Sequence, residues 1–325
     1  MSDNLSVNRR RFLKTTATGA VAATLGANII VPGRANAARK KLRILQWVHF
    51  VPAYDEWFNK KYVVEWGQKN DTEVTVDNIG IAGINARAAA EVSAQKGHDL
   101  FLFNWPPPSF EEQTVDMKDV FRLVAPDNVI RYEGGPLKVL LVDAGAKDNM
   151  VRSLLKRGAT VVRAPWHTDL APLAADCDGI VIGNGPGDPK DLMPLVTQVR
   201  SLLPSYRKPI FGICLGHQIL ALAAKGDTYK LPYGHRGVNQ PVQDLITRRC
   251  YITSQNHGYA VRHEALPGDW EPWFVNVNDG TSEGIRARTR PFFSVQFHPE
   301  ASPGPEDTAF LFDDFMRVVG AMARG

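Results

Sequence analysis

The stretch PIFGICLGHQIL, residues 209–220, places a cysteine between two glycines where an apolar strand pattern gives way to a helical one. Gly212 and Gly216 each stand two residues from Cys214, so the chain can turn sharply and the strand and helix can approach closely. A nucleophile on such a strand–turn–helix corner projects from the end of a parallel sheet. The pattern predicts an α/β fold with Cys214 at the carboxyl edge of the sheet and the N-terminus of a helix.

Strand and helix patterns alternate around this corner. Short apolar runs typical of a sheet buried on both faces occur at 137–143, 160–164, 179–183 and 209–213, and helical patterns at 147–156, 191–203 and 214–226. Residues 251–296 predict shorter antiparallel strands, and 306–321 a final helix. We expect residues 137–325 to form one domain with a mixed, mostly parallel sheet and helices on both faces.

The N-terminal 37 residues differ in composition from the rest of the chain. "NRRRFLK" precedes an uncharged stretch, Thr15–Gly33, and a small-residue cleavage site, Ala35–Ala37, so residues 1–37 resemble a twin-arginine export signal. A membrane anchor is the alternative, but four threonines, three glycines, an asparagine and a proline suit a bilayer span poorly. No later stretch predicts a membrane span.

Residues 38–118 predict a small, incomplete α/β unit. Strand patterns at 42–47, 72–77 and 99–103 alternate with helical patterns at 53–68 and 84–94. "WVHFVPAYDEWF" and "ARAAAEVSAQKGHDLFLF" resemble the opening of an extracellular solute-binding protein of the sugar-binding type. Tryptophans 47, 57, 66 and 105 could stack on sugar rings or belong to the core. Residues 119–136, ending in Gly-Gly-Pro, are expected to be a linker.

Charge and cysteine content exclude two classes of function. The net charge is +4, but residues 1–37 hold five basic residues and one acid, which leaves 33 of each sign in the remainder. We therefore expect no nucleic-acid partner. Three cysteines, Cys177, Cys214 and Cys250, without a CxxC pair indicate neither a disulfide framework nor a zinc site.

A nucleophilic cysteine needs a partner base, because a free thiol is mostly protonated at neutral pH. His298 follows the apolar run 292–297, and Pro299 keeps the backbone extended there. His298 and Glu300 then share one face, so the carboxylate can hold the imidazole tautomer. His217 is a weaker candidate, because it lies on the elbow helix and cannot easily turn back over the sulfur.

The loop GNGPGDP, residues 183–189, follows a buried strand and should lie at the same sheet edge, where ligands collect in open α/β folds. Gly187 can offer a backbone N–H without a side chain in the way. Together with the N–H of Leu215, it would form an oxyanion hole.

Six motifs carry a family resemblance: GNGPGDP, GICLGHQ, GHRGVNQPV, ITSQNHGYAV, NDGTSEGI and FHPEASPGP, in this order. Residues 137–325 are similar to a class I glutamine amidotransferase domain, and particularly to that of the carbamoyl-phosphate synthetase small subunit. The resemblance implies that Cys214 forms a γ-glutamyl thioester, His298 transfers protons and Glu300 orients His298. It implies substrate contacts by Gly185, Gly187, Leu215, Gln218, Asn256, Gly258 and Tyr259. Tyr259 stands where the family usually has phenylalanine.

The resemblance also implies partners. Glutamine is the substrate, the chain itself needs no metal or cofactor, and ATP would be used by a large synthetase subunit. The family's usual N-terminal domain, which docks on that subunit, is replaced here by the signal-like segment and residues 38–118, so ammonia delivery is doubtful. Location conflicts as well, since the signal predicts periplasmic export whereas the family is cytoplasmic.

Two alternatives stay open. The chain could be an exported, truncated solute-binding module with a passenger amidotransferase domain. It could also be a thiol hydrolase that acts on another γ-glutamyl compound.

Overall fold

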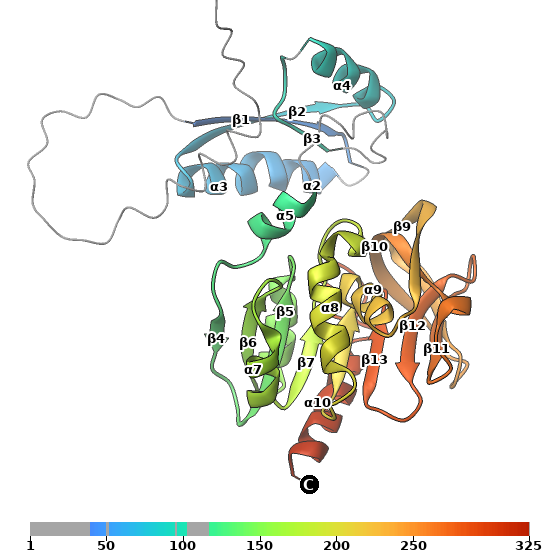
Figure 1. Ribbon diagram of the computed structural model, residues 1–325. Helices are drawn as coiled ribbons and strands as arrows, with labels where there is room; N and C mark the ends of the chain where they lie inside the picture. Colours follow the sequence, from blue (N-terminus) through green and yellow to red (C-terminus); the bar gives the residue numbers. More distant parts are fainter. Residues whose placement is uncertain (1–39, 50–51, 95, 103–116, 325) are drawn as a thin grey trace, which may run out of the picture. The chain divides into compact units, whose positions relative to one another are not determined.

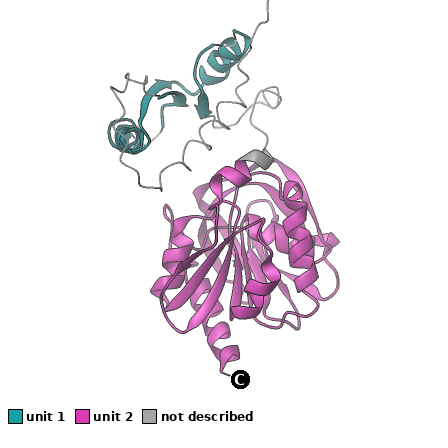
Figure 2. Ribbon diagram, turned by 60° about the vertical axis from the view of Figure 1, so that its left-hand side comes forward, with its two compact units in different colours: residues 1–115 teal, residues 116–325 magenta. Residues whose placement is uncertain are grey.

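The computed structural model describes residues 40–49, 52–94, 96–102 and 117–324. The chain divides into two compact units, Met1–Val115 and Asp116–Gly325, which Figure 2 distinguishes by colour. The signal-like segment 1–37 and Trp105 lie outside the described residues. Within the described ranges, no helix combines the length and apolar character that crossing a bilayer requires.

The first unit contains a three-stranded parallel sheet in the order β2-β1-β3. Its elements are β1 (Lys40–Trp47), α2 (Pro52–Trp57), the π-helix η1 (Phe58–Tyr62), α3 (Val63–Lys69), β2 (Thr72–Ile79), α4 (Ile84–Ser93) and β3 (Leu100–Leu102). The predicted strand–helix–strand–helix–strand order is confirmed, although a π turn interrupts the first helical segment. Its small core includes Ile44 and Leu45 of β1 and Ile84 and Ala88 of α4.

The second unit contains a ten-stranded mixed sheet in the order β10-β9-β11-β12-β13-β8-β7-β5-β6-β4 (Figure 1). The strands are β4 (Ile130–Tyr132), β5 (Leu137–Asp143), β6 (Ala159–Pro165), β7 (Gly179–Ile182), β8 (Ile210–Ile213), β9 (Asp227–Asp244), β10 (Cys250–Arg262), β11 (Trp270–Asn276), β12 (Ser282–Ala287) and β13 (Phe292–Val295). The central strands β13, β8, β7, β5 and β6 are parallel, and the flanking strands pair antiparallel.

Helices cover both faces of this sheet, as the sequence predicted. They are α5 (Met117–Val124), α6 (Asp148–Lys156), α7 (Leu170–Asp176), α8 (Met193–Leu202), α9 (Leu215–Ala223) and α10 (Phe310–Ala323), with 3-10 turns η3 (Pro189–Leu192) and η4 (His263–Ala265). Alternate strand residues enter two separate cores, one with α7, α8 and α9 and the other with α6 and α10. Leu140 and Leu141 of β5 illustrate the alternation, because side chains of neighbouring strand residues point to opposite faces.

The stretch 119–136 differs from the linker that the sequence suggested, because it is folded into the second unit. Phe121 of α5 is fully buried, and its ring packs edge-on against Trp166 with the centroids 6.4 Å apart. β4 pairs antiparallel with β6 and forms one edge of the sheet. Burial of the Phe121 side chain and pairing of β4 with the edge of β6 therefore hold these residues in the domain.

The direction of the central parallel strands determines where the functional loops lie. The carboxyl ends of β5, β7, β8 and β13 meet at one edge of the sheet, because these strands run in the same direction. The segments that leave this edge carry Lys147, the glycine-rich loop 183–189, Cys214 and His298.

Candidate active site

Cys214 occupies the sharp turn between β8 and α9 in a strained backbone conformation. Its φ is 55° and its ψ is −104°, a region that L-residues rarely adopt. Such a residue costs on the order of 1–3 kcal/mol and persists only where the surroundings enforce it. A hydrogen bond from the Cys214 N–H to the carbonyl of Val295, 2.8 Å long, ties the turn to β13.

The two glycines beside this turn are required by close backbone contacts. A Cβ on Gly212 would lie 2.6 Å from the carbonyl oxygen of Gly216. A Cβ on Gly216 would lie 1.9 Å from the carbonyl oxygen of Ile182 in β7. The sharp strand–helix corner inferred from the sequence is therefore present, and it exists because neither glycine has a side chain.

His298 follows β13, the strand that pairs with β8, and this adjacency brings the imidazole to the thiol. Val295 is in register with Ile213, the residue before Cys214. The imidazole Nδ1 of His298 lies 2.6 Å from Oε1 of Glu300, and the side chain of Glu300 is fully buried. Cys214, His298 and Glu300, the three residues that the sequence proposed as a catalytic group, thus lie together.

The His298 and Glu300 side chains of this group carry opposite charges. Burial alone would lower the pKa of His298, but interactions with Cys214 and Glu300 outweigh it and raise the pKa to about 10. Burial opposes ionisation of Glu300, yet His298 and then Lys147 hold the pKa of this carboxyl below its usual value. At neutral pH the group therefore contains an imidazolium next to a carboxylate.

Two residues that the sequence analysis missed support Glu300 from the loop and helix after β5. The ammonium Nζ of Lys147 lies 3.2 Å from Oε1 of Glu300 and donates to the carbonyl of Ala301 at 2.7 Å. Asn149 donates from its side-chain amide to the carbonyl of Glu300. More than 150 positions separate these residues from Glu300, so only the fold could reveal the contact.

A cleft of about 720 Å³ lies in front of Cys214 and His298. All seven residues that the family resemblance named as substrate contacts line it: Gly185, Gly187, Leu215, Gln218, Asn256, Gly258 and Tyr259. A cleft of this volume is large enough for a small-molecule ligand. Gly187 has a φ of 80°, which favours glycine, and Leu215 is the first residue of α9.

Gln218 and His217 have different environments although they are neighbours on α9. The side-chain Nε2 of Gln218 donates to the carbonyl of Tyr259 at 2.8 Å and to Oε1 of Gln296 at 3.0 Å, which leaves the Gln218 Oε1 for a ligand. His217 is fully buried, its Nδ1 lies 2.8 Å from Oγ of Ser294, and burial lowers its pKa to about 3. It does not line the cleft.

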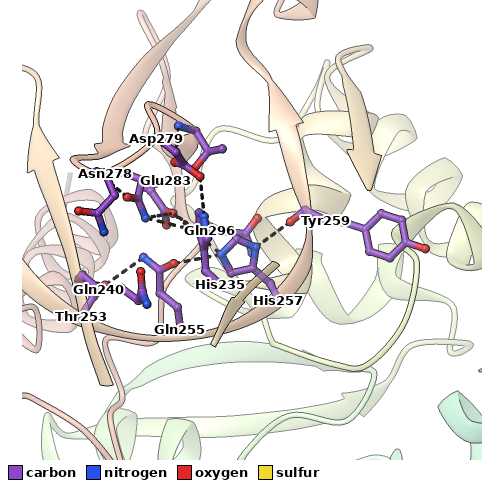
Figure 3. A network of polar contacts seen from close by, with 12 residues as sticks. His235, Gln240, Thr253, Gln255, His257, Tyr259, Asn278, Asp279, Glu283 and Gln296 are labelled. Carbon is purple, nitrogen blue, oxygen red and sulfur yellow. Dashed lines mark hydrogen bonds and ion pairs between the residues drawn. The ribbon is translucent and has the colours of Figure 1, made fainter. Parts of the chain in front are cut away.

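A network of polar contacts (Figure 3) includes Gln255, His257 and Tyr259 of β10, which also line the cleft. His235 of β9 lies between Glu283, 3.1 Å from its Nδ1, and Asp279, 2.8 Å from its Nε2. Burial alone would lower the pKa of His235, but these carboxylates raise it to about 9. His257 of β10 stays neutral, since burial lowers its pKa to about 3, and its Nδ1 donates to the carbonyl of Tyr259.

Three groups of this network could be considered as metal ligands. The candidate ligand atoms of His235, His257 and Glu283 lie within 4.8 Å of one another. Zinc bonds of about 2.0–2.1 Å would require ligand atoms about 3.4 Å apart, and both His235 nitrogens already face carboxylates. An ion-pair network that supports β10 describes these contacts better than a metal site.

Comparison with known proteins agrees with this geometry. Residues 140–318, more than half of the chain, match the family Glutamine amidotransferase class-I. A crystal structure described as a GMP synthase subunit from Thermoplasma acidophilum has the same fold, with a TM-score of 0.52 and 22% identity over 58% of this chain and 96% of that one.

Two curated relatives are carbamoyl-phosphate synthases. The chain is 40% identical to the mitochondrial ammonia-type enzyme of Rattus norvegicus over 285 residues, 86% of this chain and 18% of that protein. It is 41% identical to the arginine-specific small chain of Saccharomyces cerevisiae over 271 residues, 81% of this chain and 64% of that protein.

Both alignments are too long to be confined to residues 137–325, so they extend into the preceding part of the chain. The chain spans less than two thirds of either relative. The family match over 140–318, together with a mixed sheet that carries a cysteine at its strand–helix corner, identifies this chain as a class I glutamine amidotransferase, homologous to the small-chain region of carbamoyl-phosphate synthases.

Proposed function

We propose that this chain hydrolyses glutamine to glutamate and ammonia through a Cys214–His298–Glu300 triad. The observation that carries the proposal is that Cys214 and His298 line one cleft, with the thiol on a strained corner and the imidazole held by the buried Glu300. Glu300 acts through His298 and is a positioning residue.

The proposed reaction has two halves. The Cys214 sulfur attacks the side-chain amide carbon of glutamine, and the charge on the carbonyl oxygen is stabilised by the N–H groups of Gly187 and Leu215. His298 then gives its proton to the amide nitrogen, the C–N bond breaks, and ammonia leaves a γ-glutamyl thioester. Water attacks the thioester while His298 accepts its proton, and cleavage of the C–S bond releases glutamate.

We further propose that the ammonia serves carbamoyl-phosphate synthesis, and hence the formation of arginine or pyrimidine precursors. Support comes from two relatives that are named carbamoyl-phosphate synthases. The synthetase chemistry and the use of ATP would belong to a large partner subunit. The second unit would form the glutaminase domain, and the first unit would determine whether docking to that partner is possible.

The test is glutamate release by the full chain and by its Cys214→Ser variant. We expect wild-type activity and a loss of at least about 10³-fold in the variant, because a serine hydroxyl is a far weaker nucleophile than an activated cysteine. Circular dichroism controls for folding. A folded wild-type chain that releases no glutamate, or a variant that keeps its activity, would contradict the proposal. Competition with other γ-glutamyl compounds tests whether glutamine is the preferred substrate.

A second candidate function concerns the first unit, as an exported solute-binding module. Aromatic rings of Tyr54, Trp57, Phe58 and Tyr62 form a cluster, in which Tyr54 and Tyr62 each lie 5.1–5.9 Å, centroid to centroid, from both Trp57 and Phe58. Trp57 is 45% exposed. Such rings can stack on sugars. A tryptophan-fluorescence titration with a sugar panel tests this proposal, and an unchanged spectrum with every sugar counts against it.

The location of the protein follows from which proposal holds. Cleavage after Ala37 and periplasmic recovery would fit the twin-arginine-like segment, whereas recovery of the uncleaved chain from the cytoplasm would fit a role in carbamoyl-phosphate synthesis. The mass of the mature protein in its native cell, measured for each compartment, distinguishes the two.

A further inference from the structure

The cleft in front of Cys214 has an uneven distribution of charge. Among the described residues that line it, the charged ones are Lys147, Arg236 and His298, and none is an aspartate or a glutamate. Two of these cations have carboxylate partners, since both Lys147 and His298 contact Glu300. In the described part of the chain, no ion pair is formed by Arg236.

The guanidinium of Arg236 is nevertheless held in place. Its Nη1 donates to the carbonyl of Tyr233 at 2.8 Å. A Cβ atom placed on Gly234 would lie 2.8 Å from the same Nη1 atom. A Cβ atom placed on Gly258 would lie 3.7 Å from Nη2 of Arg236. One side of the guanidinium is therefore fixed against β9, and the group lies next to Gly258 in the cleft wall.

The backbone beside Arg236 is also irregular. Asn256 pairs with Arg236 and Tyr259 pairs with Lys230, but the register shifts between His257 and Tyr259 and leaves Gly258 without a partner residue. A bulge of this kind re-aims backbone and side chains, and bulges are common next to active sites. The bulge places a residue without a side chain against the guanidinium, so a ligand can approach Arg236 closely.

From these observations we propose that Arg236 is a specificity-determining residue that binds the α-carboxylate of the amino-acid substrate. This inference rests on the proposed glutaminase function and adds the substrate class, a free α-amino acid rather than a peptide or an α-amide. A guanidinium suits this task, because its fork of N–H donors matches the two oxygens of a carboxylate. The neutral γ-amide would then be directed toward Cys214, because the cleft has its uncompensated positive charge at Arg236.

The first experiment compares the kinetics of glutamine hydrolysis by the full-length wild type and Arg236→Gln. We expect KM to rise about 10-fold to 100-fold with kcat nearly unchanged, since the contact is made equally in the ground and transition states. Arg236→Lys should recover part of the affinity. Arg249→Gln is the matched control, because it removes an exposed arginine from the turn between β9 and β10, outside the cleft. Its KM should match the wild type.

The second readout is substrate preference, which a merely structural role would not change. The wild type should prefer glutamine to glutamine α-amide at least about 10-fold, and Arg236→Gln should lose most of this preference. Rising salt should weaken glutamine binding to the wild type more than to the variant. An unchanged KM and preference in Arg236→Gln, or equal losses in Arg249→Gln, would overturn the proposal.

A third measurement separates this inference from the proposed function. A diazoketone analogue of glutamine and the α-amide of that analogue can alkylate Cys214, with labelling located by peptide mass spectrometry. A preference for the free acid that disappears in Arg236→Gln supports carboxylate binding even if the wild type releases no glutamate. Equal labelling by both reagents in the wild type would reject it, whatever the hydrolytic activity. Equal alkylation of Cys214 by iodoacetamide in wild type and variant shows that the thiol is intact.

Discussion

Two histidines of the second unit lie against carboxylates and have raised pKa values, but only one of these two lies beside a thiol. His298 pairs with Glu300 and its pKa is raised to about 10, while His235 lies between Asp279 and Glu283 and its pKa is raised to about 9. Interactions with Cys214 and Glu300 at His298, and with Glu283 and Asp279 at His235, therefore give both imidazoles a positive charge at neutral pH. A raised histidine pKa does not by itself identify a catalytic residue.

Position in the sheet distinguishes the cluster around His298 from the cluster around His235. His298 leaves the carboxyl end of a parallel strand next to the strand of Cys214. His235 lies on an antiparallel strand, where it contacts β12 and the turn before it and packs edge-on against the ring of His257. One cluster can transfer a proton in the cleft, and the other holds the wall of the cleft.

The sharpest test of this comparison exchanges each histidine for asparagine. His298→Asn should lower the kcat for glutamine hydrolysis about 10²-fold to 10⁴-fold, the range that a positioned acid–base group contributes. His235→Asn should change kcat less than about 10-fold, because it touches no reacting atom. Steady-state kinetics with matched circular dichroism spectra measure both effects. Similar losses of kcat in two folded variants would remove the distinction between the clusters.

A smaller effect is expected when a carboxylate partner is neutralised. Glu300→Gln should lower kcat about 10-fold to 100-fold and shift the basic limb of the pH–rate profile to lower pH, because the imidazolium loses its stabilising charge. Asp279→Asn is the matched control in the other cluster. Its pH–rate profile should follow the wild type, and a shift as large as that of Glu300→Gln would show that the clusters are coupled.

The smallest effect concerns stability and pH. The folded-state pKa of His235, about 9, lies above the unfolded value of about 6.5. Its stabilising contribution is therefore fully present below pH 6.5 and is lost as the pH rises through 9. Solvent screening limits it to about 1 kcal/mol.

Urea unfolding at pH 6 and pH 9.5 measures this contribution. The stability difference between wild type and His235→Asn should shrink at the higher pH. Because other groups titrate in both proteins, only the difference between them reports on His235. A difference that is the same at both pH values would mean that His235 is not charged in the folded protein.

Local sequence determined much of the fold. The apolar runs and helical patterns predicted the central parallel strands and their helices, because burial on two faces imposes continuous apolar strands. Gly212, Cys214 and Gly216 also predicted the sharp corner, since their spacing leaves few other conformations. The long strand β9 was not predicted, because its residues alternate only weakly in exposure. The folded stretch 119–136 was missed because Phe121 is buried by residues distant in sequence.

Some features of the candidate site were likewise determined by the sequence, and others only by the tertiary structure. The sequence by itself determined which residues could react, because a thiol, an imidazole and a carboxylate carry their chemistry wherever they lie. Only the tertiary structure decided which of them meet. Register between β8 and β13 brings His298 to Cys214, and the loop after β5 brings Lys147 to Glu300. The register shift between β9 and β10 leaves Gly258 unpaired beside Arg236. Contacts between residues far apart in the chain depend on strand order and register, which short-range patterns do not encode.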